Sequence, residues 1–361
     1  MLSRRGLRTP FIRLVKDGTV IDAARYTRSG GVGATIADQV VDDRVLELFA
    51  DGHTVVLQAL HRLWSPLIDF GGDLTSELGH PVQINAYITP SASQGFAAHY
   101  DIHDVFVLQI SGHKRWRIHE PVHVDPLRTQ PWTDHRQAVS ARASERPSVE
   151  VVLEPGDALY LPRGYVHAAE ALGDVCCHLT VGVQGHTRHS IVEALAALVA
   201  DDASLRQSLL LGLDVCDPDD LATEVAVTID ALIARLQLVT AEAVAPLLEA
   251  RTRTSTRPAP LDPLAQAEAL GRLDIDSVII ARTHLRASLA VRGDELVLEL
   301  PGRTLRFPLA ARDAIDALID TGLPIRIGDL PALSESEALA LSRELVRAGV
   351  AVPQNSAAPH G

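Results

Sequence analysis

The sequence of 361 residues contains only three cysteines, and two of them, Cys176 and Cys177, are adjacent. Adjacent cysteines do not make a disulfide framework, and this usage fits a reducing compartment. No apolar run reaches the length of about 18 residues that a membrane-spanning helix needs. The basic start MLSRRGLRTP is not followed by the apolar core of a secretory signal. These absences predict a cytoplasmic protein with no membrane partner.

Positive charge is also scarce, because 46 Asp and Glu against 33 Lys and Arg give a formal net charge of -13. An acidic chain is a poor ligand for the nucleic-acid backbone, and it favours a basic partner such as an Arg-, Lys- or His-rich peptide. A Ser-His-Asp order and a phosphate-binding glycine loop are both missing. The content of 47% hydrophobic and 22% charged residues is typical of a globular chain, here long enough for two or three domains.

Short strand patterns separated by Gly and Pro turns dominate the first half of the chain. Many strands of this kind predict a double-sheet jelly roll, the double-stranded β-helix of cupins, over residues 1–185. A turn at Ser111-Gly112-His113 is expected to join two of the strands, and Gly79 is a plausible end for one of the helices. The predicted strands are 11–15, 54–57, 82–88, 105–110, 114–118, 149–153, 158–161 and 177–183, and the predicted helices are 42–49 and 65–78.

The sequence pattern changes at Gly185 from short strands to helices, and Ala- and Leu-rich helical patterns cover 190–213, 219–238 and 241–252. Each has an apolar side too large to be solvated all round, so these helices need a partner surface. We therefore expect residues 186–255 to form an α-helical dimerisation region and the protein to be a homodimer.

Residues 256–361 combine helical patterns with short strands and predict an α+β, winged-helix-like domain. Ser334 and Glu337 have the spacing of a capping box at the start of a helix. Between Pro258 and Pro353, fourteen acidic residues face ten basic ones, which disfavours a direct nucleic-acid partner. The tail from Gln354 to Gly361 is predicted to be disordered. The expected helices are 263–272, 310–321 and 334–348, and the expected strands are 288–291, 295–300 and 304–308.

A candidate metal site begins with His99 and Asp101, which stand two apart in a segment that alternates like a strand. Both side chains should leave the same face. Further downstream, the segment GDALYLPRGYVHAAE predicts a short strand and a tight bend before His167. Two neutral imidazoles and one carboxylate on Fe(II) leave three positions open, enough for a bidentate co-substrate and O2. A satisfied structural histidine and a dinuclear zinc hydrolase that also uses His103 and Asp104 are the alternatives.

Lys114 is the remaining candidate. Strand alternation places Lys114 and Trp116 on one face and Arg115 and Arg117 on the other. An ammonium inside an apolar jelly roll is costly unless it meets an anion. The distal carboxylate of 2-oxoglutarate would be that anion; the alternative is a surface lysine beside the two arginines.

Four segments, NAYITP, SQGFAAHYDIHDVFVLQISGHKRWRI, PGDALYLPRGYVHAA and HLTVGV, together resemble the JmjC-type, cupin-like 2-oxoglutarate oxygenases. The resemblance is to the ribosomal oxygenase branch, also called the bacterial cupin-4 family, and the order of the three regions extends it over most of the chain. It implies the following site residues: Fe(II) ligands at His99, Asp101 and His167, a 2-oxoglutarate partner at Lys114, and pocket roles for Asn85, Tyr87 and Thr180.

The same resemblance implies a protein hydroxylase that uses Fe(II), 2-oxoglutarate and O2. An Arg or His side chain of a ribosomal protein is the implied target. Eukaryotic relatives carry a serine near the substrate where this chain has Gly182, so a hydroxylase of a biosynthetic precursor peptide is an alternative. A non-catalytic metal-binding cupin and a peptide-binding module are the rivals from other classes, and the sequence does not separate hydroxylation from demethylation.

Overall fold

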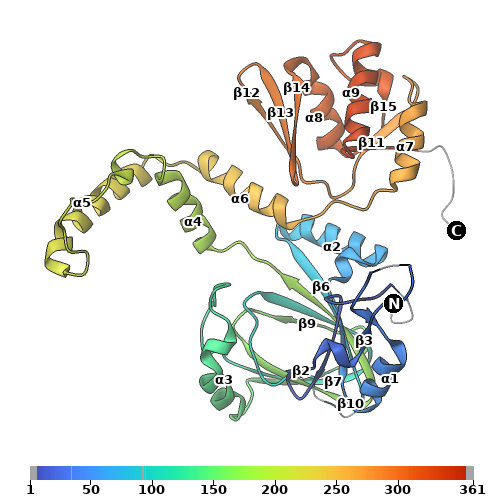
Figure 1. The fold of residues 1–361 in the computed structure, drawn as a ribbon, viewed down its shortest axis with the longest axis vertical. Coiled ribbons are helices and arrows are strands. Elements are labelled where there is room, and N and C mark those ends of the chain that lie inside the picture. Colours follow the sequence, from blue (N-terminus) through green and yellow to red (C-terminus); the bar gives the residue numbers. More distant parts are fainter. Residues whose placement is uncertain (1–5, 34, 92, 94, 355–361) are drawn as a thin grey trace. The chain divides into compact units, whose positions relative to one another are not determined.

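The computed structural model describes residues 6–33, 35–91, 93 and 95–354. The chain divides into two compact units, Met1–Gly185 and His186–Gly361 (Figure 1). From residue 355 onward, the tail for which disorder is predicted lies outside the described residues.

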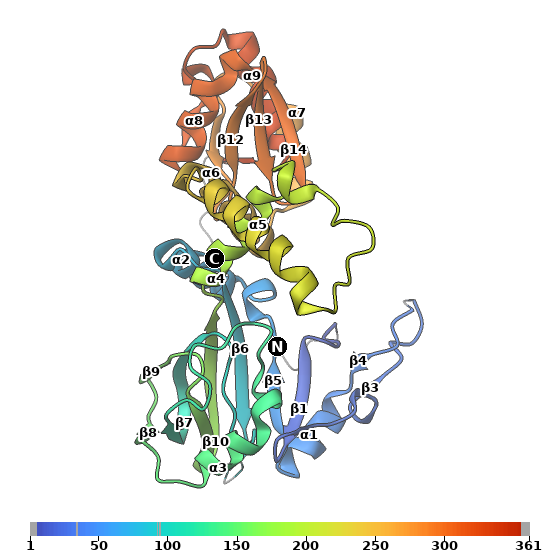
Figure 2. The same ribbon diagram turned by 90° about the vertical axis from the view of Figure 1, so that its left-hand side faces the viewer.

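The first unit is built around an antiparallel sheet in the order β2-β1-β5-β6-β10-β7-β8, with β9 also paired to β7. The long strands β7 and β10 pair with each other along their length (Figure 2). The other edge of β7 pairs first with β9 and then with β8, and the other edge of β10 pairs with β6 over its second half. The predicted jelly roll is confirmed. Its strands are β1 (Ile12–Lys16), β2 (Thr19–Val20), β5 (Thr54–Leu57), β6 (Val82–Thr89), β7 (Asp104–His119), β8 (Val149–Leu153), β9 (Ala158–Leu161) and β10 (Val166–Val183).

One face of this sheet packs against helices and the other forms the inner face of the jelly roll. The helices α1 (Asp42–Ala50) and α2 (Ser65–Leu78) share a core with apolar residues of β1, β5, β6 and β10. Because side chains alternate along a strand, the intervening residues point away from this core. Gly79 ends α2 in the left-handed conformation, with φ 69°, as predicted. The unit is completed by β3 (Thr27–Arg28), β4 (Gln39–Val40) and α3 (Arg136–Ala143).

The hairpin expected at Ser111-Gly112-His113 is wrong, since β7 runs unbroken from Asp104 to His119. It stays paired with β10 on both sides of a bulge between Leu172 and Cys177. Gly112 has φ +65°, and a Cβ there would lie 2.6 Å from the carbonyl oxygen of Val175. The glycine therefore bends a continuous strand against its partner instead of reversing the chain.

The second unit begins with α4 (Arg188–Val199), α5 (Pro218–Leu236) and α6 (Ala241–Ser255). The helix predicted over 190–213 is too long, because the chain leaves the helix after Val199. Asp202 then accepts hydrogen bonds from the backbone N–H and the hydroxyl of Ser204, at 2.9 and 2.6 Å. Such local bonds from an aspartate compete with helix formation.

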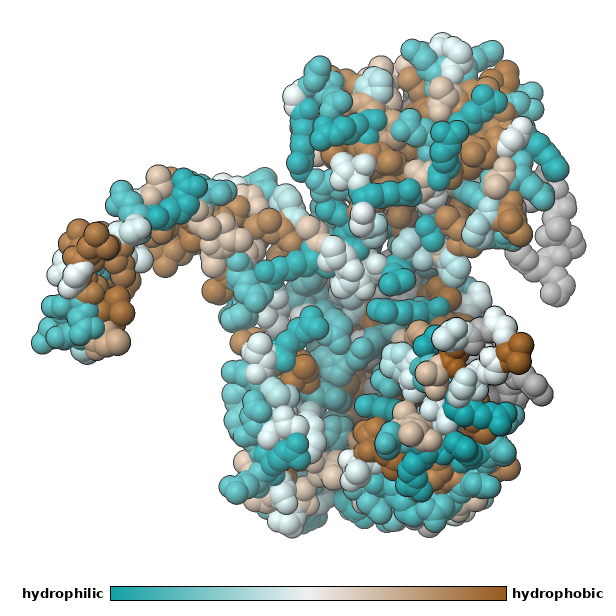
Figure 3. Space-filling model, viewed as in Figure 1, coloured by the Kyte–Doolittle hydropathy of each residue, from teal (hydrophilic) through white to brown (hydrophobic). Residues whose placement is uncertain are grey.

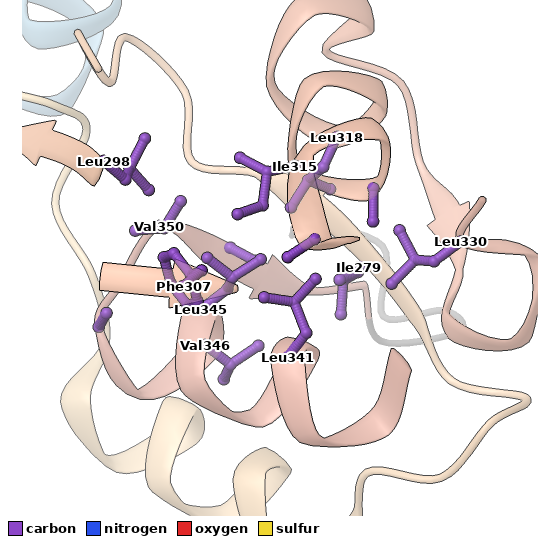
Figure 4. Close-up of a cluster of buried hydrophobic side chains, with 14 of the residues drawn as sticks. Ile279, Leu298, Phe307, Ile315, Leu318, Leu330, Leu341, Leu345, Val346 and Val350 are labelled. Atoms are coloured by element: carbon purple, nitrogen blue, oxygen red, sulfur yellow. The ribbon is translucent and has the colours of Figure 1, made fainter. Parts of the chain in front are cut away.

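The remainder of this unit contains two three-stranded sheets, β15-β11-β16 and β12-β13-β14, with a shared apolar core (Figure 4). The capping box of Ser334 and Glu337 is confirmed. The sheet β15-β11-β16 was not predicted, because strands of two to four residues carry no readable period. The elements are α7 (Pro263–Arg272), β11 (Val278–Ala281), β12 (Ser288–Arg292), β13 (Glu295–Leu300), β14 (Arg303–Pro308), α8 (Arg312–Thr321), β15 (Ile325–Arg326), α9 (Glu335–Arg347) and β16 (Ala351–Pro353).

Helix α5 exposes an apolar face. Val225, Ile229 and Ile233 follow one another at helical spacing and are 45%, 49% and 50% exposed, and apolar side chains stand out on the surface of this segment (Figure 3). Across the described residues, no single helix is long and apolar enough to cross a membrane, although α5 and α6, bent by 94°, meet the length and composition test together.

Candidate metal and co-substrate site

The structure brings the three predicted ligands together. His99 and His167 form an isolated antiparallel bridge, in which each backbone N–H donates to the other residue's carbonyl, at 3.1 and 2.8 Å. Asp101 follows two residues after His99, and its Oδ2 lies 3.7 Å from Nε2 of His167. One ligand atom of each residue lies within 4.8 Å of the others. Such a cluster of two imidazoles and one carboxylate fits a divalent transition metal.

Backbone carbonyls orient both imidazoles. Nδ1 of His99 lies 2.8 Å from the oxygen of Ala97, and Nδ1 of His167 lies 3.0 Å from the oxygen of Tyr165. Donation from each Nδ1 leaves Nε2 as the free lone pair, the arrangement usual for metal-binding histidines. Burial, with the charge of His99, lowers the pKa of His167 to about 4, so this imidazole is neutral at pH 7.

The carboxylate of Asp101 is ionised in this setting. Burial by itself raises its pKa, but the neighbouring His167 and His99 outweigh that effect and bring the pKa below its ordinary value. The cluster therefore offers a neutral imidazole at His167 and a negative charge at Asp101.

Lys114 lies on the inner face, as alternation predicted. It is 4% exposed and Trp116 is 5% exposed, whereas the side chains of Arg115 and Arg117 are 37% and 42% exposed. The ammonium donates to the hydroxyl of Thr89 at 3.3 Å. Burial lowers the pKa of Lys114 to about 8. Among the described residues no carboxylate forms an ion pair with this ammonium, so its positive charge is buried without an internal counter-ion.

His178 connects Lys114 to the predicted residues of β6. Its Nδ1 lies 3.4 Å from the ammonium, and its ring stacks on that of Tyr87 with centroids 4.9 Å apart. Burial and the charge of Lys114 hold the pKa of His178 well below its ordinary value, so it is a neutral histidine that supports Lys114. Thr180 is paired with Asn85, and the Oδ1 of Asn85 accepts from the N–H of Ala59 at 3.0 Å.

Arg13 is a residue of the inner face that the sequence reasoning missed. The strand register aligns Arg13 with Val56 and Tyr87, so these side chains leave the same face. Its guanidinium carbon lies 5.4 Å from the ring centre of Phe96, and its Nε is buried without a hydrogen-bond partner within the described ranges. Burial raises the pKa of Tyr87, and the charge of Arg13 opposes that rise.

A signal for Arg13 was available in the sequence. It interrupts the apolar segment Ile12–Lys16 between Ile12 and Leu14, which are 1% and 0% exposed. In a strand, this position points to the opposite face from its neighbours. A charge there is typical of either a solvated face or a polar interior.

The jelly roll and the cluster of two histidines and an aspartate lie in a region that is similar to JmjC domains. A model of the JmjC domain matches residues 71–191, and the predicted resemblance to ribosomal oxygenases is confirmed.

Among similar proteins, human ribosomal oxygenase 1 is 32% identical over 195 residues, which cover 52% of this chain and 29% of that protein. The bifunctional lysine-specific demethylase and histidyl-hydroxylase NO66 of Drosophila persimilis is 39% identical over 132 residues, 36% of this chain and 18% of that protein. The matched region thus spans less than a third of these relatives. Escherichia coli ribosomal oxygenase YcfD has the same fold, with a TM-score of 0.51, 18% identity, and coverage of 95% of this chain and 86% of that chain.

Proposed function

We propose that this chain is an Fe(II)- and 2-oxoglutarate-dependent protein hydroxylase. The observation that carries the proposal is the combination of the His99, Asp101 and His167 cluster with a buried lysine that has no counter-ion among the described residues. A closed structural metal site binds no anionic co-substrate, so it would not compensate the charge of such a lysine. A 2-oxoglutarate oxygenase needs one positive group beside its metal.

In this proposal the chain's own residues bind and orient the reactants. Nε2 of both histidines and the carboxylate of Asp101 would hold Fe(II). The ammonium of Lys114 pairs with the distal carboxylate of 2-oxoglutarate, while Thr89 and the neutral His178 keep it in place. Bound iron supplies oxidation by O2, in which 2-oxoglutarate becomes succinate and CO2 and one oxygen atom enters a substrate C–H bond.

Asn85, Tyr87 and Thr180 are proposed to line the pocket that binds 2-oxoglutarate together with Lys114. They leave the same inner face as His178, at successive positions of paired strands. Holding one substrate carbon next to the metal is the main contribution that a protein makes to such a reaction.

The proposed target is an Arg or His side chain of a ribosomal protein. Support comes from the similarity to ribosomal oxygenases and to a histidyl-hydroxylase. The E. coli protein of the same fold, at a TM-score of 0.50, has a structure in complex with cobalt and succinic acid. A biosynthetic precursor peptide is the alternative substrate, and a non-catalytic metal-binding cupin is the alternative function.

The domain roles are also proposals. Residues 186–255 are proposed to form a homodimer through the exposed apolar face of α5, because burying Val225, Ile229 and Ile233 would remove large apolar side chains from water. Residues 256–361 are proposed to be a winged-helix-like domain without a nucleic-acid partner. A cytoplasmic location completes the proposal.

Succinate release from 2-oxoglutarate, with iron and ascorbate present, tests the enzyme. The wild type should produce succinate, and Asp101→Ala should not. Mass spectrometry of the proteome with and without the gene should then show a gain of about 16 Da, one oxygen atom, on a defined residue. Absence of succinate with any peptide, and without peptide, would favour the non-catalytic cupin.

A further inference from the structure

Gly182 faces a side chain that leaves no room for a Cβ. A Cβ built on Gly182 would lie 2.5 Å from Nε2 and 2.7 Å from Cδ2 of His103, and 3.0 Å from Nε2 of Gln83. The backbone of Gly182 is part of β10 and does not have the positive φ that favours glycine elsewhere in the chain. What limits a side chain at this position is therefore the imidazole of His103 in its present place, and not the backbone conformation.

His103 reaches this position from the segment that carries the metal ligands. It stands two residues after Asp101, just before β7, and lies close enough to influence the pKa values of Asp101 and His167. Its imidazole passes over Gly182 of the neighbouring strand β10 and reaches β6, where the amide of Gln83 lies 2.8 Å from Nε2. The ring thus closes one end of the inner face, between the metal ligands and the paired strands β6 and β10.

Gln83, Asn85 and Tyr87 alternate onto one face of β6, and Gly182 is paired with Gln83. The imidazole of His103 therefore borders the row of residues that line the proposed pocket. Its Nδ1 is buried and has no hydrogen-bond partner in the part of the chain that the structure describes. Such an unsatisfied atom is unfavourable in the free protein and is available to a bound group.

We propose that His103 is a specificity-determining residue. Its imidazole occupies the space that a side chain at position 182 would take, and it selects the side chain that is hydroxylated. This inference rests on the proposed function. Selection follows from two properties of the imidazole: its volume limits what fits beside Asp101, and its Nδ1 offers a hydrogen bond to a target that reaches it.

Gly182→Ala and His103→Ala probe the geometry. The alanine methyl group has to displace the imidazole and break its contact with Gln83, so Gly182→Ala should lower the melting temperature of the wild-type chain. In the His103→Ala background the space is free, and the same substitution should have little effect. Gly185→Ala is the matched control, because nothing lies within 4 Å of a Cβ at that position.

The specificity itself is measured in cells that lack the gene and carry either the wild type or a variant. The readout is the fraction of each protein site with one added oxygen, normalised to succinate production by the purified enzyme. His103→Ala and Gly182→Ala should each lower this ratio at the wild-type site at least tenfold, or move the added oxygen to other sites. His103→Gln, which keeps a planar hydrogen-bonding group, should recover part of the loss, and Gly185→Ala should stay within twofold of the wild type.

An unchanged ratio and an unchanged set of sites in His103→Ala would overturn the proposal, while succinate production would show that the oxygenase itself is correct. An equal loss of melting temperature from Gly182→Ala in both backgrounds would overturn the steric argument. If the wild type made no succinate, the proposed function would fail first, and the specificity role would fail with it.

Discussion

Replacing Lys114 by methionine should stabilise the ligand-free protein and at the same time abolish its binding of 2-oxoglutarate. The side chain is 4% exposed, and burial lowers its pKa from 10.5 to about 8. This lowering of the pKa corresponds to about 3 kcal/mol of unfavourable free energy for the charged form in the folded state. Methionine has a similar length and no charge, so it removes this cost.

The gain is smaller than this upper value, because two hydrogen-bond partners are lost. Thr89 and His178 each lose a contact with the ammonium, at about 1 kcal/mol per unsatisfied group. We therefore expect a net gain in the free energy of unfolding of about 1–2 kcal/mol at pH 7.

The gain should also depend on pH in a definite direction. Below pH 8 the ammonium is charged in both the folded and the unfolded chain, and the folded wild type bears the full cost. As the pH rises from 8 to 10.5, the folded state loses its proton first and the cost fades. The advantage of Lys114→Met should therefore be largest at neutral pH and should shrink at pH 10.

Urea unfolding of the ligand-free protein at pH 7 and at pH 10 measures this stability difference, and calorimetric titration with 2-oxoglutarate in the presence of Mn(II) measures binding. Arg115→Met is the matched control, since the side chain of Arg115 is 37% exposed on the same strand and its ion pair with Glu150 spans 3.6 Å. Such a surface pair contributes about 0.5 kcal/mol. A Lys114→Met variant that is less stable than the wild type at pH 7, or that still binds 2-oxoglutarate with wild-type affinity, would refute the reasoning.

Four further outcomes are expected. The affinity for 2-oxoglutarate should fall above pH 8, by at most about tenfold per pH unit, as Lys114 loses its proton; a flat titration from pH 7 to 9.5 would contradict this. Asp101→Ala should lower the affinity for Mn(II) at least about 100-fold in equilibrium dialysis, and retained binding would rule out the triad. Gly112→Ala should cost about 2–4 kcal/mol in urea unfolding, because its Cβ would lie 2.6 Å from a carbonyl oxygen of β10. Gly173→Ala also has a positive φ but meets nothing within 4 Å, so it should cost about 1 kcal/mol, and equal costs would disprove the clash. Ile229→Asp should shift the protein from dimer to monomer in analytical ultracentrifugation, and an unchanged mass would argue against α5 as the interface.

Local sequence patterns predicted several elements to the residue. The strands over 54–57, 149–153 and 158–161 and the helix over 65–78 have the predicted bounds. These segments contain β-branched or periodic apolar residues and are closed by Gly or Pro, so neighbours in the chain decide their limits.

Errors occur where distant parts of the chain decide the conformation. The glycine of Ser111-Gly112-His113 has the composition of a turn, but pairing with β10 keeps β7 extended through it. The helix α3 (Arg136–Ala143) is not among the predicted elements, because only Val139 is buried in it and its amphipathic signal is weak.

The sequence by itself determined which chemical groups are available and which faces of the strands they occupy. The two-residue spacing of His99 and Asp101 and the inward position of Lys114 follow from strand alternation, which is a local property of the backbone.

Only the tertiary structure decided which groups meet. The bridge that joins His99 to His167, the approach of Arg13 to Tyr87, and the filling of the space at Gly182 by an imidazole all depend on contacts between segments far apart in the chain. Register and packing between such segments are set by the whole sheet and its core, and no short stretch of sequence contains them.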